Sequence, residues 1–321
     1  MTAPAAKDER TTVAVGYDGS EAAQAAVRWA AEYAAAGGYR LRVVHAWIWP
    51  VFTKKLGPVK GVEGSGLRHA AEVVLAEGVE LARSALAAAQ ERAAQARATQ
   101  GQPASTGPEP GPGEAAEPAA EPGSRVEGVM EAGLPAAVLR NAARDARLLV
   151  VSSRGLGGVL GHIAGSVCLD LAGSSPCPLM VIRRQRSPGQ AAGPVVVGID
   201  GTSRSAAALA GAARLAKTLG TALQIVHIDK SRGGPREGHG RHGPRHGQDL
   251  LDHTLEEARH LAPELSISGV LREGQAASKE LLASATDAEV LVIGTHNREG
   301  GPGNTVTAVL NKARFNVLIT R

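Results

Sequence analysis

Residues 13–45 read VAVGYDGSEAAQAAVRWAAEYAAAGGYRLRVVH, and residues 195–227 read VVVGIDGTSRSAAALAGAARLAKTLGTALQIVH. The two stretches align without a gap, and fourteen of the 33 aligned residues are identical. A second correspondence follows in each half, where LLVVSSRG at 148–155 aligns with VLVIGTHN at 290–297. Self-similarity that spans the chain in this way predicts two copies of one fold.

Within each copy, short apolar runs alternate with helical segments. The run at 13–17 has the composition of a strand buried on both faces, and Asp18-Gly19-Ser20 supplies a turn and a helix N-cap. This alternation predicts an α/β fold of two tandem doubly wound, Rossmann-like domains, each with a five-stranded parallel sheet and helices on both faces. The expected strands are 13–17, 41–47, 125–131, 148–152 and 179–182 in the first copy, and 195–199, 223–228, 267–272, 290–293 and 317–320 in the second.

Changes in composition along the chain suggest the domain boundaries. Pro- and Gly-rich segments with few large apolar residues cannot bury a core and are expected to be disordered or flexible. The expected order is a disordered tail at 1–11, a first domain at 12–186 with a disordered insertion at 99–123, a linker at 187–193, and a second domain at 194–321 with a flexible loop at 231–247.

Composition also disfavours several classes of function. The net charge of +4 over 321 residues includes no dense basic stripe, and aromatic residues make up only 2%, so nucleic-acid binding is disfavoured. No run approaches the roughly 20 apolar residues of a membrane-spanning helix. The polar N-terminus and the two cysteines, Cys168 and Cys177, favour a reduced, cytoplasmic setting.

Two segments carry residues suited to binding an anion. In an open parallel sheet, ligands bind beyond the carboxyl ends of the strands, where strand order reverses. Gly16-Tyr17-Asp18 follows the first strand, and SSRGLGGVLGHIAGS at 152–166, called the glycine loop below, follows the fourth. Its glycines let main-chain N–H groups approach a phosphate, and the helix beginning at Ser166 adds further donors. The glycine loop is therefore predicted either to bind polyphosphate or to form a flexible turn.

Both halves resemble the universal stress protein family, and the whole chain resembles its tandem-domain members. The matching segments are VGYDGSEAAQAAVRWA, VVHAW, AGLPAAVL, VVSSRGLGGVLGHIAGS and SSPCPLMVIRR. The nucleotide-binding branch of this family carries Gly, two residues, Gly, nine residues and then Gly-Ser/Thr. In this chain those positions are Ser152, Gly155, Gly165 and Ser166, so serine replaces only the first glycine.

The resemblance implies an ATP-binding stress-response regulator with little or no catalysis, using ATP with or without Mg²⁺. It places the adenosine end near Asp18 and Ala46, and Ser152 is expected to weaken nucleotide binding rather than abolish it. The expected nucleotide-binding residues are Gly16, Tyr17, Asp18, Ala46, Ser152, Arg154, Gly155, Gly165, Ser166 and Val167. Two alternatives stay open, namely a slow ATP hydrolase or nucleotidyl transferase, and an interaction module that binds no nucleotide.

The second half has a less complete loop. Gly294 matches the first glycine, but Asn297 stands at the second. The closing Gly-Ser pair falls either on Thr307-Ala308 or, in a loop four residues shorter, on Gly303-Asn304. Under either alignment the sequence predicts that only the first half binds nucleotide well.

The family resemblance also implies self-association through the fifth strands. Residues 179–182 and 317–320 are expected to pair within the chain as an internal pseudo-dimer, and a homodimer of chains is left open.

The histidines and cysteines are expected to have mainly structural roles. His45 and His227 end equivalent strands and are expected to be hydrogen-bonded there, and both cysteines are expected to be buried. His239, His242 and His246 lie in a Gly/Pro-rich segment, which favours a solvated loop over a metal site.

Overall fold

The computed structural model describes residues 11–47, 65–99, 125–155, 164–185, 190–229, 247–274, 276–295 and 301–321. The chain divides into two compact units, Met1–Arg147 and Leu148–Arg321. Apart from Thr99 and Gly247, the predicted insertion at 99–123 and the predicted loop at 231–247 lie outside the described residues. The division falls within the first expected domain, and the expected boundaries stay a prediction.

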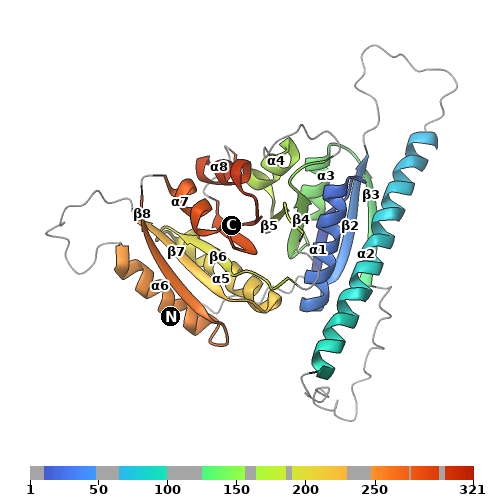
Figure 1. Ribbon diagram of the computed structural model, residues 1–321. Coiled ribbons are helices and arrows are strands. Elements are labelled where there is room, and N and C mark those ends of the chain that lie inside the picture. The colour runs from blue at the N-terminus through green and yellow to red at the C-terminus, as the bar shows by residue number, and fades with distance from the viewer. Residues whose placement is uncertain are drawn as a thin grey trace, which may run out of the picture. The chain divides into compact units, whose positions relative to one another are not determined.

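The unit Met1–Arg147 is a three-layer α/β structure. Its elements are β1 (Thr12–Gly16), α1 (Glu21–Gly37), β2 (Arg40–Trp47), α2 (Ser65–Thr99), β3 (Val126–Ala132) and α3 (Pro135–Ala142). The strands are parallel in the order β3-β2-β1. Helices α1 and α2 pack together against one face, and α3 contacts β2 from the other (Figure 1).

The unit Leu148–Arg321 contains the remaining strands. Its elements are β4 (Leu148–Ser152), α4 (Ser166–Ser174), β5 (Leu179–Ile182), β6 (Val195–Ile199), α5 (Ser203–Leu219), β7 (Leu223–Asp229), α6 (Gly247–Leu261), β8 (Ile267–Glu273), α7 (Ala277–Ser284), β9 (Val290–Gly294), α8 (Asn304–Lys312) and β10 (Asn316–Thr320). The strand order is β4-β5-β10-β9-β6-β7-β8. Helices α5 and α6 pack together on one side, and α7 and α8 on the other (Figure 1).

The predicted α/β architecture is confirmed. The inner strands are buried as their apolar composition requires, whereas β3 and β8 are mostly exposed or half-buried. In β4, β5, β9 and β10, nearly every residue is inaccessible to solvent. In the described part of this unit, neighbouring strands are parallel except β5 and β10, where Val181 pairs with Val317 and Met180 with Leu318. The two fifth strands therefore pair within the chain, whereas association between chains stays a prediction.

Helices α1 and α5 end in the same way. Their C-caps, Gly38 and Gly220, have φ angles of 68° and 64° in the left-handed region. A side chain would meet no atom within 4 Å at either position, so the backbone angle alone favours glycine.

Candidate functional site

The predicted site residues of the first unit lie at one end of two neighbouring strands. Gly16 ends β1, and Tyr17 and Asp18 follow it. Ala46 lies at the carboxyl end of the parallel strand β2. The Oδ1 atom of Asp18 accepts hydrogen bonds from the main-chain N of Ser20 (3.0 Å) and from its hydroxyl (2.6 Å). The Ser20 hydroxyl in turn caps α1, so Asp18 organises the start of that helix.

The packing of a neighbouring helix favours glycine at position 16. A Cβ atom placed on it would lie 3.1 Å from Leu139 of α3. The equivalent Gly198 of β6 meets Leu281 of α7, with a corresponding distance of 2.7 Å. The repeated glycine thus lets a leucine of the covering helix approach the strand end in each half.

Tyr17 uses all its hydrogen-bonding groups within the first unit. Its N–H donates to Val44 O (2.9 Å), its carbonyl lies 2.8 Å from His45 Nδ1, and its hydroxyl donates to Glu77 of α2 (2.7 Å). Burial, reinforced by the Glu77 carboxylate, raises the pKa of Tyr17 to about 12. The side chain of Tyr17 therefore fastens α2 over the end of β1.

The predicted phosphate-binding residues belong to the second unit. The hydroxyl of Ser152 donates to the carbonyl of Arg154 (2.6 Å), and the N–H of Gly165 donates to Ser153 O (2.9 Å). Helix α4 follows with Gly165 as its N-cap, and no side chain caps it. The start of α4 therefore presents main-chain donors and a partial positive charge. Residues 156–163 of the glycine loop lie outside the described part of the chain.

A cavity of about 270 Å³ lies in the second half, at the carboxyl ends of β6 and β9. The register between these strands runs only from Val195 to Val197, so their last residues diverge. Because β7 and β10 lie on opposite sides of this pair, strand order reverses here. A crevice at this position is the usual ligand site of an open α/β sheet.

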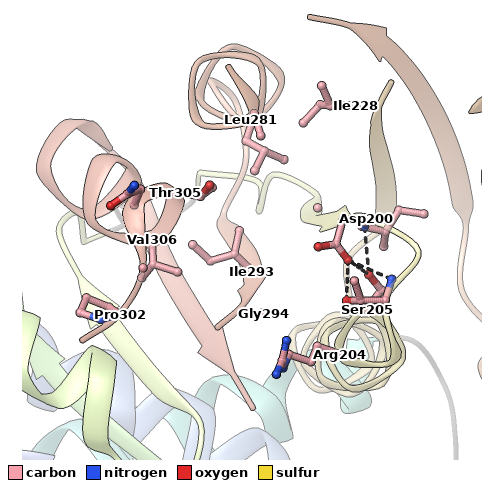
Figure 2. Close-up of a pocket in the computed structure, with 16 residues that line it drawn as sticks. Asp200, Arg204, Ser205, Ile228, Leu281, Ile293, Gly294, Pro302, Thr305 and Val306 are labelled. Atoms are coloured by element: carbon pink, nitrogen blue, oxygen red, sulfur yellow. Dashed lines mark hydrogen bonds between the residues drawn. The ribbon is translucent and has the colours of Figure 1, made fainter. Parts of the chain in front are cut away.

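The cavity has an apolar wall and a polar rim. Ile228, Leu281 and Ile293 line it together with the start of α8. Figure 2 shows Thr305 and Val306 of α8 on one side of Ile293, and Arg204 and Ser205 of α5 on the other. Such a lining suits a largely apolar group with a charged substituent at the mouth.

Asp200, the counterpart of Asp18, again organises a helix start. Its Oδ1 accepts hydrogen bonds from the Thr202 hydroxyl (2.7 Å) and the Ser205 hydroxyl (2.8 Å), and the latter accepts the N–H of Asp200 (2.9 Å). These hydrogen bonds are drawn in Figure 2. Arg204, on the same turn of α5, brings a positive charge to the rim of the cavity.

The structure selects one of the two loop alignments. Helix α8 begins at Asn304 with Gly303 as N-cap, just as α4 begins at Ser166 with Gly165 as N-cap. The shorter loop ending at Gly303-Asn304 is therefore the equivalent one, and these two residues also line the cavity.

Sequence reasoning missed several residues of this cavity, among them Arg204, Ile228, Leu281 and Val306. The alignment of Asp200 with Asp18 pointed to the region. The apolar wall, however, comes from side chains spread over five elements, and no local motif marks them.

The expected roles of the histidines and cysteines are confirmed where the structure describes them. His45 Nδ1 lies 2.8 Å from Tyr17 O, and His227 Nδ1 lies 3.1 Å from Ile199 O, so both rings bridge neighbouring strands. Cys168 and Cys177 are buried. Burial raises the pKa of the Cys168 thiol to about 12, which removes it as a nucleophile near neutral pH.

Within the described residues, no cluster of three or more His, Cys, Asp or Glu side chains is placed to hold a metal ion. His239, His242 and His246 fall outside that part of the chain. Among the helices that are described, none is long and apolar enough to cross a membrane.

Comparison with known proteins gives one consistent answer. The model of the universal stress protein family matches residues 9–183 and 192–321. Universal stress protein Rv1996 of Mycobacterium tuberculosis is 28% identical over 330 residues, covering 96% of this chain and 94% of the relative. Universal stress protein Rv2623 of the same organism is 30% identical over 192 residues, covering 56% of this chain and 62% of the relative.

A solved structure gives the same fold. The crystal structure of a universal stress protein from Archaeoglobus fulgidus has a TM-score of 0.67 at 16% sequence identity, covering 98% of this chain and 97% of that one. At this identity the likeness concerns the fold alone.

Proposed function

Because the chain belongs to the universal stress protein family, we propose that it binds adenine nucleotide and acts as a stress-response regulator through that binding rather than through rapid catalysis. The observation that carries this proposal is the cavity at the switch point between β6 and β9. ATP, with or without Mg²⁺, is the proposed ligand.

The chemistry of the second-half cavity favours a nucleotide. Its volume of about 270 Å³ lies just below the roughly 300–1,000 Å³ of most small-molecule sites. The sequence predicted that only the first half binds nucleotide well. Because of this cavity, we propose in addition that the base and sugar of a nucleotide can fill the apolar part of the second-half site. The phosphates then extend past the rim, toward Arg204 and the start of α8.

The first-half site remains the glycine loop. Arg154, Gly155, Gly165, Ser166 and Val167 are the proposed phosphate-binding residues, which the uncapped start of α4 supports. The proposed nucleoside-binding residues are Gly16, Tyr17, Asp18, Ala46 and Ser152. The hydroxyl of Ser152 is already bonded to the Arg154 carbonyl, which favours weakened rather than abolished binding there.

Equilibrium binding of labelled ATP to the full chain, with and without Mg²⁺, tests the proposal. We expect saturable binding with a micromolar Kd, about −8 kcal/mol. Gly155→Asp should remove the first-half site by placing a carboxylate among the phosphates. Gly294→Val should fill the second-half cavity, and its Cβ would lie 3.6 Å from Arg204 O, an ordinary contact.

The two variants locate the sites as well as test them. If only one variant loses ATP binding, the nucleotide binds in the half of the chain that carries that substitution. If each variant loses part of the binding, both halves bind nucleotide. Absence of saturable binding by the unmodified chain at millimolar ATP contradicts the proposal and favours a pure interaction module. Undiminished binding in the double variant places the nucleotide elsewhere. Nucleotide extracted from the purified protein identifies the natural ligand.

A further inference from the structure

Helices α4 and α8 are related by the internal repeat, and each ends close to the loop that leads into the other. Both are nine residues long, and both follow a glycine N-cap. The two helices contact each other, and Figure 1 shows them side by side. Each helix thus starts at one proposed nucleotide loop and ends near the other.

Asn311, near the end of α8, makes a hydrogen bond across this junction. Its Oδ1 accepts the main-chain N–H of Ala164 at 3.2 Å. The next residue, Gly165, donates its own N–H to Ser153 O at 2.9 Å. Two successive N–H groups are therefore fixed just before Ser166, where the proposed phosphate donors begin.

The reverse contact lacks this hydrogen bond. By the repeat, Gly173 of α4 occupies the place of Asn311, and Pro302 the place of Ala164. Glycine has no side chain to accept a hydrogen bond, and proline has no N–H to donate. Gly173 instead approaches the backbone closely, since a Cβ there would lie 3.0 Å from Gly301 Cα and 3.2 Å from Pro302 N.

Two arginines bind main-chain carbonyls at the C-terminal ends of α4 and α8. Arg183, directly after β5, donates to the carbonyls of Leu310 and Ala313 at the end of α8. Arg321, directly after β10, donates to Ala172 O in α4 at 3.2 Å. Cations at helix C-termini complement the exposed carbonyls, so both helix ends are held. Asn311 is therefore presented to Ala164 from a fixed position.

We propose that Asn311 is a positioning residue for the nucleotide site of the first half, although it belongs to the second half of the chain. It orients the peptide at Ala164, and so the N–H groups of Ser166 and Val167, toward the phosphates. The proposal rests on the proposed function, because it concerns the same glycine loop.

The test compares ATP affinity in a Gly294→Val background, so that only the first-half site is read. Asn311→Leu removes the acceptor at similar size and should weaken binding about two- to tenfold, the usual range for one hydrogen bond. Asn311→Asp keeps an acceptor and should restore the affinity to within about twofold of the background. Lys312→Leu, an exposed change on the same turn, is the matched control.

Amide hydrogen exchange without nucleotide gives a second readout. Asn311→Leu should accelerate exchange at Ala164 and the following amides of α4, while the melting temperature and the rest of the unit change little. Unchanged affinity in Asn311→Leu, or equal weakening in Lys312→Leu, overturns the proposal. If the background protein binds no ATP, the proposed first-half function fails. In that case, unchanged exchange at Ala164 shows that Asn311 does not position the loop either.

Discussion

At the scale of single residues, equivalent positions in the two halves perform different tasks. Tyr17 and Ile199 directly follow the equivalent glycines Gly16 and Gly198. Ile199 lines the cavity, whereas Tyr17 is bonded through its hydroxyl to Glu77 of α2. The alignment predicted that the two positions are equivalent. It could not predict the partner of the hydroxyl, because Glu77 is 60 residues away in the sequence.

Ionisation of the Tyr17 hydroxyl should make the stability of the protein pH-dependent in the alkaline range. The pKa of Tyr17 in the folded protein, about 12, exceeds the ordinary tyrosine value of about 10, so the folded protein retains a proton that the unfolded chain releases. The contribution is complete below about pH 10 and is lost as pH rises toward 12. Denaturant unfolding over this range should therefore show a fall in the free energy of unfolding. The fall should be smaller in Tyr17→Phe, and equal slopes in the two proteins would contradict the prediction.

At the scale of elements, the position of α2 depends on a glycine. A Cβ at Gly78 would lie 2.5 Å from the buried ring of Tyr17, so the helix can approach β1 only where a side chain is missing. Helix α2 is rich in Ala, Glu and Arg, residues that favour helix. Which face of that helix meets the sheet was not predicted, because that depends on the shape of its neighbour.

Gly78→Ala should destabilise the protein although alanine favours helix. Helix propensity contributes up to about 1 kcal/mol in favour of the change. Overpacking against Tyr17 costs about 1–3 kcal/mol, so a net loss of about 1 kcal/mol is expected from denaturant midpoints. Gly66→Ala on the same helix is the control, since no atom lies within 4 Å of a Cβ there. A Gly78→Ala protein as stable as Gly66→Ala would refute this account.

At the scale of the larger unit, the pairing of β5 with β10 makes one continuous sheet from segments of both repeats. Asn316, which begins β10, is 2% exposed. Its Oδ1 accepts the N–H groups of Arg183 (2.9 Å) and Arg184 (3.1 Å), which follow β5. One buried amide thus satisfies two main-chain donors of the other repeat.

Removing this acceptor should weaken the junction between the repeats. Asn316→Ala leaves the N–H groups of Arg183 and Arg184 without the Oδ1 acceptor. We therefore expect the free energy of unfolding to fall by about 1–3 kcal/mol. Asn304→Ala, the same change at an exposed asparagine, should alter stability by less than about 0.5 kcal/mol. Thermal melting of the two variants checks this, and equal melting temperatures would count against the role assigned to Asn316.

The amino-acid sequence by itself determined the repeated α/β architecture, the buried strands and the family. These follow from apolar runs, turn residues and glycines, whose effects are local and recur in both halves. Only the tertiary structure decided that the cavity opens between β6 and β9, that Gly303-Asn304 is the true loop end, and that Asn311 reaches Ala164. Each of these depends on segments far apart in the chain. Their contacts arise when the sheet is assembled, and no residue pattern within one segment encodes them.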